Sequence, residues 1–199
     1  MLHPKFKTAN PIVIGFTGYK QSGKNTVASS LGLLFATTKS IHPISDIYFE
    51  AFAKGVKQRV ADAFGIDVKT VEDCKQHPLV RRVLQYTGTE WGREEDGQDV
   101  WVKDLASRVQ QLPLKKRIVI IITDVRFINE AEWVKKQDGC LVRIEREGLK
   151  NNDLHQSEIE IDKIQSPDFR LYNDGKSFVK LNGDVKVLFE NIKERYGID

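Results

Sequence analysis

Residues 18–24 read Gly-Tyr-Lys-Gln-Ser-Gly-Lys, which fits the pattern G-x-x-x-x-G-K. The two glycines of this pattern let the backbone wrap tightly, so that successive N–H groups point inward at an anion. A helix after the loop directs the positive end of its dipole at the same point, and Lys24 adds a flexible positive charge. The segment therefore predicts a phosphate-binding loop formed by Gly18, Tyr19, Lys20, Gln21, Ser22, Gly23, Lys24, Asn25 and Thr26.

Both flanks of this loop have the pattern that it needs. Residues 12–16 form a short, mainly β-branched run that is typical of a buried parallel strand. After the loop, apolar residues recur at helical spacing, namely Val27, Ala28, Leu31, Leu34 and Phe35. A glycine turn without a ligand is the alternative. Because strand, loop, lysine and helix coincide, the phosphate site is favoured.

Asn25 stands where this pattern usually has a serine or threonine whose hydroxyl binds Mg²⁺, and Thr26 follows it. An amide oxygen is a weaker ligand for a hard cation, and water could also mediate the contact. Asn25 and Thr26 are therefore alternative candidates for the metal site.

The composition predicts a globular protein with a single core. A chain of 199 residues with 40% hydrophobic and 30% charged residues suits one α/β domain with insertions. Its 31 basic and 28 acidic residues are interspersed, so that no basic stripe for nucleic acid is present. We therefore expect no nucleic-acid partner.

Neither a membrane segment nor a disulfide framework is expected. No apolar stretch approaches the roughly 20 residues that span a bilayer. Residues 1–10 are polar and lack the apolar part of a secretion signal, so a cytoplasmic protein is expected. Cys74 and Cys140 are isolated thiols. Cys74 and His77 have metal-like spacing, but no second pair completes a zinc site.

Strand-like and helix-like segments alternate along the chain. We expect strands at 12–16, 47–53, 118–122, 140–144 and 169–172. Residues 66–78 are polar and predict an excursion over the surface. Residues 87–97 predict a binding loop, and residues 149–166 predict a mobile cover. This alternation favours a three-layer α/β domain with a mainly parallel five-stranded sheet.

Asp124 and Arg126 follow directly after residues 118–122, the strongest strand signal in the chain. Ligands of open α/β sheets bind at the carboxyl ends of the strands, where the phosphate loop also lies. We therefore expect an active-site role for both residues, with Asp124 as a candidate metal ligand. Alternatively, Asp124 caps the helix that begins near Phe127, a role that is compatible with catalysis.

A phosphate loop, a strand-end aspartate and several arginines beside a polar cover together suggest phosphoryl transfer. Arg143 and Arg146, at and just beyond the end of a strand, are sited to supply positive charge from such a cover. Solvated surface positions are an equal alternative for these two arginines.

Further motifs extend the pattern across most of the chain. They are Phe-Ala-Lys-Gly-Val-Lys at 52–57, Thr-Gly-Thr-Glu-Trp-Gly-Arg at 87–93, Asp-Val-Trp-Val at 99–102, Thr-Asp-Val-Arg-Phe-Ile-Asn-Glu at 123–130 and His-Gln-Ser-Glu at 155–158. With the phosphate loop, they resemble, in the same order, the deoxynucleoside monophosphate kinases of bacteriophages. These enzymes are relatives of the P-loop nucleoside monophosphate kinases.

The resemblance implies a P-loop kinase fold with helices on both faces of the sheet. The single domain 1–199 would have its core at about 11–65, 113–147 and 167–199. An acceptor-binding insertion would lie at about 66–112 and a lid-like segment at about 146–166. Members are commonly dimeric, so the resemblance also implies a homodimer, in the cytoplasm of the host cell if the protein is viral.

The resemblance further implies that ATP with Mg²⁺ is the donor and that a deoxynucleoside monophosphate is the acceptor. Catalysis would fall to Lys24, Asp124, Arg126, Arg143 and Arg146. Trp101 could stack on a base or belong to a helix core. The acceptor region would include Lys57, Arg82, Glu90, Arg93, Trp101, Arg126 and Glu158.

Three other functions fit parts of the pattern. Animal phosphomevalonate kinases carry a similar Gly-Lys-Asp loop and Asp-Val-Arg strand end. A nucleotide-dependent switch or motor is a second alternative, although no Asn-Lys-x-Asp guanine-reading stretch occurs and Val125 replaces an acidic residue after Asp124. A silent binding module is the third, and Lys24 with the arginine set disfavours it.

Overall fold

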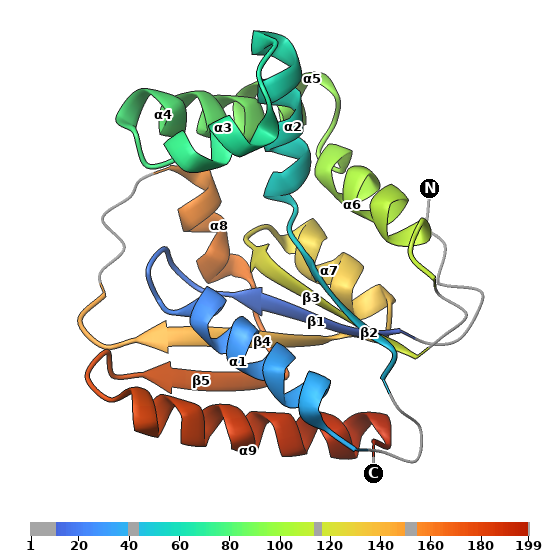
Figure 1. Ribbon diagram of the computed structural model, residues 1–199. Coiled ribbons are helices and arrows are strands. Elements are labelled where there is room, and N and C mark those ends of the chain that lie inside the picture. The colour runs from blue at the N-terminus through green and yellow to red at the C-terminus, as the bar shows by residue number, and fades with distance from the viewer. Residues whose placement is uncertain (1–10, 40–43, 114–116, 150–154, 199) are drawn as a thin grey trace.

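Five parallel strands form the centre of the molecule in the computed structural model, which describes residues 11–39, 44–113, 117–149 and 155–198 (Figure 1). Their order across the sheet is β2-β3-β1-β4-β5, and each adjacent pair is parallel. The strands are β1 (Ile12–Thr17), β2 (Asp46–Glu50), β3 (Ile118–Val125), β4 (Cys140–Arg146) and β5 (Phe169–Asn173). The predicted five-stranded sheet is confirmed, except that β2 ends at Glu50 rather than at residue 53.

Helices cover both faces of this sheet, which confirms the three-layer prediction (Figure 1). On one face lie α1 (Lys24–Thr37) and α9 (Phe178–Tyr196), and on the other lie α6 (Val100–Gln110) and α7 (Ile128–Lys136). Successive side chains of a strand point to opposite faces. Ile14 of β1 accordingly packs in the cluster with α1 and α9, while Val13 packs in the cluster with α6 and α7.

A helical insertion, residues 53–110, connects β2 to β3 and stands above the carboxyl ends of the strands (Figure 1). It contains α2 (Ala53–Phe64), α3 (Val68–Cys74), α4 (Pro78–Tyr86), the π-helical turn η1 (Thr87–Trp91), α5 (Gly92–Glu95) and α6. The segment expected as an excursion over the surface, residues 66–78, is largely exposed and contains α3, which Asp67 caps by accepting a hydrogen bond from the backbone N–H of Thr70 at 2.9 Å.

The expected binding loop at 87–97 is also mainly helical. The indole N–H of Trp101 donates to the carbonyl of Gly88 at 2.7 Å, and a Cβ on Gly92 would lie 2.4 Å from the Trp101 ring. Glycine at position 92 thus lets η1 and α5 pack directly on α6. Tertiary packing decides the conformation here, against the low helix propensity of glycine and threonine.

Asp99 precedes α6, and its carboxylate accepts from the side chain of Asn129. The polar segment expected as a mobile cover, residues 149–166, contains the helix α8 (Gln156–Lys163), which buries Glu158 and Ile161, while residues 150–154 of that segment lie outside the described residues. None of the described helices is long and apolar enough to cross a membrane.

Candidate active site

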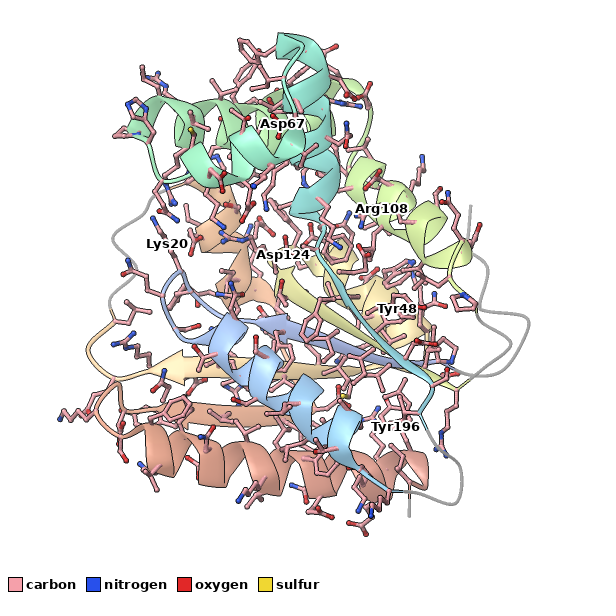
Figure 2. The ribbon with its side chains drawn as sticks, viewed as in Figure 1. Lys20, Tyr48, Asp67, Arg108, Asp124 and Tyr196 are labelled. Carbon is pink, nitrogen blue, oxygen red and sulfur yellow. The ribbon has the colours of Figure 1, made fainter. Side chains whose placement is uncertain are left out.

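A cavity of about 750 Å³ lies between the carboxyl edge of the sheet and the helical insertion. Its walls come from the phosphate loop, the turn that joins β2 to α2, the end of β3, the insertion and the start of α8. Lys20 of the loop and Asp124 of β3 lie at this edge, beneath the insertion (Figure 2). The position is the one at which open α/β sheets bind ligands.

Three residues of the phosphate loop have positive φ, namely Gly18 (138°), Gln21 (65°) and Gly23 (102°). A Cβ on Gly18 would lie 2.3 Å from the carbonyl oxygen of Ile144, so only glycine fits there. Runs of residues with such backbone angles form concave sites for anions. The loop leads directly into α1, whose first residue is Lys24. The predicted strand, loop and helix are therefore all present.

The ammonium group of Lys24 lies within the loop, where it donates to the carbonyls of Gly18 and Tyr19 at 2.7 Å each. Burial, with a further contribution from the charge of Arg126, lowers the pKa of Lys24 to about 8. The negative charges of Glu158 and Asp124 act in the opposite direction. Lys24 is thus a buried cation at the predicted phosphate position.

The back of the loop is fixed by the last residues of β4 and β5. The side chain of Asn173 donates to the carbonyl of Ser22 at 2.9 Å and accepts from the N–H of Gly175 at 2.9 Å. Arg146 donates to the carbonyl of Gln21 at 2.8 Å. Asn173 was missed in the sequence, where it reads only as part of a turn.

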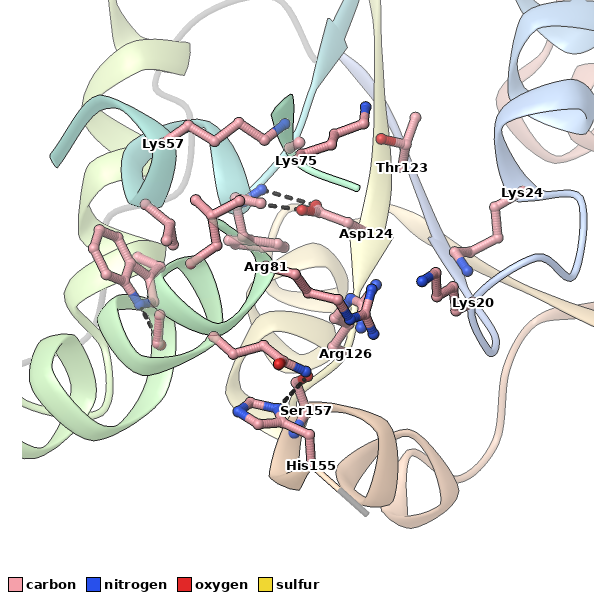
Figure 3. A pocket seen from close by; sticks show the side chains of 18 of the residues that line it. Lys20, Lys24, Lys57, Lys75, Arg81, Thr123, Asp124, Arg126, His155 and Ser157 are labelled. Carbon is pink, nitrogen blue, oxygen red and sulfur yellow. Dashed lines mark hydrogen bonds between the residues drawn. The ribbon is translucent and has the colours of Figure 1, made fainter. Parts of the chain in front are cut away.

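Both carboxylate oxygens of Asp124 accept backbone hydrogen bonds, from Phe52 at 2.8 Å and from Ala53 at 2.9 Å (Figure 3). Asp124 therefore holds the beginning of α2, not the beginning of α7 as the alternative interpretation expected. Glu130 performs that role for α7, because its carboxylate accepts from the N–H groups of Arg126 and Phe127.

Glu130 also forms a buried ion pair with Arg93 at 2.5 Å, and both side chains are almost inaccessible to solvent. The guanidinium of Arg93 lies over the ring of Phe127, 3.7 Å from its centre. Burial raises the pKa of Glu130 to about 7, against the opposing effect of the Arg93 charge. This pair joins α5 to α7 across the cavity wall, and the spacing of the two residues in the sequence gave no sign of it.

Cations converge where the phosphate loop faces the insertion. Figure 3 shows the side chains of Lys20, Arg81 and Arg126 directed toward the same part of the cavity. Arg126 forms an ion pair with Glu158 of α8, and Glu158 also accepts from the backbone N–H of Lys20 at 3.2 Å. A cluster of this kind suits an anion with several oxygens.

The remaining predicted acceptor residues lie at different depths. Lys57 lines the cavity and pairs with Glu72 at 2.6 Å. Trp101 also lines it, but its ring is buried, with 3% of the residue exposed. Arg82 and Glu90 are exposed and do not line the cavity, whereas Arg81, one residue earlier on α4, does.

Arg143 and Arg146, the two arginines predicted to act from the cover, have different positions in the structure. Arg146 lines the cavity beside the phosphate loop. Arg143 instead donates to the carbonyls of Ile161 and Ile164 and pairs with Asp162 at 3.1 Å. Arg143 thus anchors α8 to β4, and the structure does not place it on the cavity wall.

The helix α4 explains why Arg81 was missed. Leu79 of this helix is 69% exposed, and none of the helix is fully buried, so its apolar residues do not mark the face that meets the cavity. The sequence signal that could have identified the cavity face is the spacing of Arg81, Leu84 and Gln85 at i, i+3 and i+4. Other cavity residues that were not predicted include Glu72, Lys75, Gln76, Thr123, Glu130 and Ser157, whereas Gly88 and Thr89 belong to the segment predicted as a binding loop.

The oxygen-bearing side chains of the cavity fit Mg²⁺ bound together with phosphates. Asn25, Thr26, Thr123 and Asp124 all line it. Within the described part of the chain, no three His, Cys, Asp or Glu side chains gather into a metal cage. Mg²⁺ usually binds one or two carboxylates plus water and substrate phosphates, so such a cage is not needed.

Comparisons with known proteins bear on the family of this chain and on its fold. A model of the family described as deoxynucleotide monophosphate kinase matches residues 54–182. A protein of Acanthamoeba polyphaga mimivirus, named "Putative deoxynucleotide monophosphate kinase", is 30% identical over 180 residues, which cover 81% of this chain and 88% of that protein.

One solved structure supports the fold. The crystal structure of APE1195 has a TM-score of 0.51 at 14% identity and covers 93% of this chain and 96% of that one, and at this identity the likeness bears on the fold alone. Shikimate kinase from Aquifex aeolicus gives a lower TM-score of 0.45 at 16% identity, with 93% of this chain and 98% of that one covered.

Proposed function

The chain belongs to the deoxynucleotide monophosphate kinase family, and we propose that it transfers the γ-phosphoryl group of ATP to the phosphate of a deoxynucleoside monophosphate. The observation that carries this proposal is a single cavity that joins a lysine-bearing phosphate loop to a second set of cations on the helical insertion. A reaction between two phosphates needs both sets, because each substrate brings negative charge.

The donor nucleotide binds to the loop at residues 18–26. The backbone N–H groups of the loop and the N-terminus of α1 hold its phosphates. Lys24 exchanges the carbonyls of Gly18 and Tyr19 for phosphate oxygens, which bind an ammonium more strongly because they are charged. Arg146, beside Gln21, belongs to this donor side.

Asn25, Thr26 and Asp124 would hold Mg²⁺, which supplies charge neutralisation at the outer phosphates. A metal ion bound to Asp124 would also be linked to the helical insertion, because Asp124 holds the beginning of α2. Both of its oxygens accept from the beginning of α2, and each oxygen keeps further lone pairs for a second partner.

The acceptor phosphate binds on the side of the insertion. Arg81 and Arg126 reach the part of the cavity that faces the loop, and each guanidinium can form paired hydrogen bonds with a phosphate. Lys57 and Trp101 line the rest of this side. Arg93 is retained as an acceptor-side residue that acts through its pair with Glu130. Arg82 and Glu90 are exposed and lie outside the cavity, so the proposal gives them no contact with the acceptor.

Catalysis then consists of positioning and charge stabilisation. The acceptor phosphate oxygen forms the new bond to the γ-phosphorus while the bond to the β-phosphate oxygen breaks, with ADP as the leaving group. Lys24 and Arg126 stabilise the negative charge that spreads over the transferred oxygens. The insertion and α8 enclose the cavity on their sides and thus limit access of water to the transferred group.

A coupled assay of ADP release tests the reaction. It is run with dTMP, dGMP, dCMP, dAMP, the corresponding ribonucleotides and phosphomevalonate in turn. We expect release that depends on a deoxynucleoside monophosphate. Equal release without an acceptor would instead support a nucleotide-dependent switch, and release with phosphomevalonate alone would support a metabolite kinase.

Lys24→Ala tests the donor site. Removing one preorganised charged donor should lower kcat/KM by roughly 10²- to 10³-fold. The matched control is Lys186→Ala, at an exposed position of α9, which should retain full activity. Thermal unfolding of both variants establishes that they fold. Normal turnover of a folded Lys24→Ala variant would remove Lys24 from the mechanism.

A further inference from the structure

Glu158 places a buried carboxylate between the phosphate loop and Arg126. Its side chain is 2% exposed, although it belongs to a helix with a mainly polar surface. One oxygen forms an ion pair with Arg126, and the other accepts from the backbone N–H of Lys20 at 3.2 Å. The resemblance placed Glu158 with the acceptor, but its contact with the Lys20 N–H lies on the donor side, and its other partner, Arg126, lies between the two substrates in the proposed reaction.

Both partners of Glu158 are groups that bind phosphate oxygens. The N–H of Lys20 belongs to the loop whose backbone amides form the anion site. Arg126 is the guanidinium that stabilises the transferred group in the proposed reaction. A carboxylate oxygen and a phosphate oxygen make the same charge-assisted hydrogen bonds, so they compete for these donors.

The start of α8 also lies at the cavity. His155 and Ser157 line it, and the ring of His155 accepts from the N–H of Ser157 at 3.2 Å, which fixes the first turn of the helix. Further along α8, Arg143 anchors the helix to β4. The backbone that carries Glu158 is thus held at both ends, so we expect the side chain rather than the helix to move when Glu158 exchanges its contacts with Lys20 and Arg126.

We propose that Glu158 occupies, in the nucleotide-free protein, the place that the γ-phosphate of ATP takes. This inference rests on the proposed function, because it assumes that the loop binds ATP. Binding of ATP displaces the carboxylate from the Lys20 N–H and from Arg126. ADP has no γ-phosphate and leaves both contacts intact. Glu158 is therefore a donor-side residue that discriminates between the triphosphate and the diphosphate.

This arrangement has a consequence for the charge on Arg126. With ADP bound, Glu158 neutralises Arg126, and with ATP bound the γ-phosphate takes over that role. A ligand that must first displace an internal group binds with an apparent affinity reduced by the fraction of protein that is competent. Glu158 should thus weaken the binding of ATP but not that of ADP.

Titration calorimetry on Glu158→Gln tests this proposal, with the β,γ-imido analogue of ATP and with ADP as the ligands. Glutamine keeps the shape of the side chain but removes its charge. We expect Kd for the analogue to fall by roughly tenfold, whereas Kd for ADP should change by less than about twofold. Glu160→Gln on the same helix, paired with Lys163 outside the cavity, should change neither Kd.

A second variant covers the case in which Glu158→Gln does not fold. Glu158→Asp keeps the charge but shortens the side chain, so it cannot maintain both contacts at once. The analogue should then bind about threefold more tightly, again with little change for ADP, as expected for partial competition. The thermal unfolding midpoint without nucleotide reports whether each variant is folded.

Equal shifts of Kd for the analogue and for ADP would assign Glu158 a purely structural role and overturn the proposal. Weaker binding of the analogue by Glu158→Gln would overturn it as well. Both outcomes presuppose that the wild-type protein binds the analogue and transfers phosphate to an acceptor. If the wild type does neither, the proposed function itself fails, which is a separate result.

Discussion

The sheet core and the helical insertion hold their parts of the cavity in different ways. In β1 all six residues are buried, whereas no residue of α4 is fully buried. The core positions the phosphate loop by apolar packing on both faces of a parallel sheet. The insertion joins the core through the apolar face of α6, and its other helices add polar contacts, namely Asp124 with the start of α2 and Arg93 with Glu130.

This difference leads to different expectations for the two substrates, because the core carries the donor site and the insertion carries most of the acceptor site. A loop fixed by a packed core presents its donors with little rearrangement, as an anion site requires. Helices α3 and α4 contribute no fully buried residue to the two apolar clusters on the sheet, so they can shift when the contacts of the junction change. We therefore expect that substitutions in the core abolish folding or catalysis, while substitutions at the junction alter the binding of the acceptor.

The largest expected effect on stability concerns the junction itself. Arg93→Ala leaves the buried carboxylate of Glu130 without its partner, which should lower the free energy of unfolding by about 3–5 kcal/mol. Arg82→Ala, at an exposed position of α4, should change it by less than about 0.5 kcal/mol. Urea denaturation measures both. Equal stability of the two variants would mean that the insertion does not depend on this pair.

Substitutions of Arg81 and of its neighbour Arg82 test how the insertion binds the acceptor. Arg81→Ala removes a charged donor from the cavity and should raise KM for the acceptor by about ten- to a hundredfold. KM for ATP should stay within about twofold, because the phosphate loop is untouched. Arg82→Ala is the matched control. Initial rates at varied acceptor concentration give KM for the acceptor in both variants. A larger effect of Arg82 than of Arg81 would contradict the placement of α4.

Asp124 links the two regions, so its loss should loosen the junction. Asp124→Ala removes both acceptors at the start of α2 and should cost about 1–2 kcal/mol of stability, a typical value for a lost helix cap. Hydrogen exchange at the amides of Phe52 and Ala53 should accelerate. Asp67→Ala, which removes the cap of α3 away from the cavity, should cost a similar amount without affecting those two amides.

The smallest effect is a pH dependence of ATP binding. In the folded protein Lys24 has a pKa of about 8, below its ordinary value of 10.5, because it is buried. Above pH 8 the binding of phosphate must therefore also add a proton, and Kd for ATP should rise by up to about tenfold between pH 8 and pH 9. Calorimetry at these two values is the measurement, and Lys24→Ala should lose the dependence.

The same lowering of the Lys24 pKa affects the stability of the protein in the opposite direction from its affinity for ATP. Between pH 8 and pH 10.5 the unfolded chain binds more protons at Lys24 than the folded protein does. The contribution of Lys24 to the free energy of unfolding therefore rises with pH in this window. A fall of ATP affinity that accompanied a loss of stability would point to general alkaline unfolding rather than to Lys24.

The core was predictable because each of its elements has a local signal. β1 and β3 are continuous runs of mainly β-branched, apolar residues, and the glycines of the phosphate loop mark the turn between β1 and α1. These signals act over a few residues and agree with the buried, parallel sheet in which the strands lie. Asp124 and Arg126 followed from the same reasoning, since they end a strand.

The insertion was less predictable because contacts between distant residues shape it. Residues 87–95 have poor helix propensity, yet they are helical where Gly92 packs on Trp101. The pairing of Arg93 with Glu130 joins two helices and leaves no periodic trace in the sequence. For α4, the choice between Arg81 and Arg82 depends on how the helix is rotated, and its weakly buried apolar residues did not fix that rotation.

The bond from Asn173 to Ser22 ties the phosphate loop to β5, the strand that is added last as the sheet is built in chain order. During synthesis, the loop leaves the ribosome about 150 residues before this partner does. We therefore expect a nascent chain to gain its affinity for nucleotides late, after β5 has joined the sheet and Asn173 can bind Ser22. The ability to bind ATP would then report that synthesis has passed Asn173.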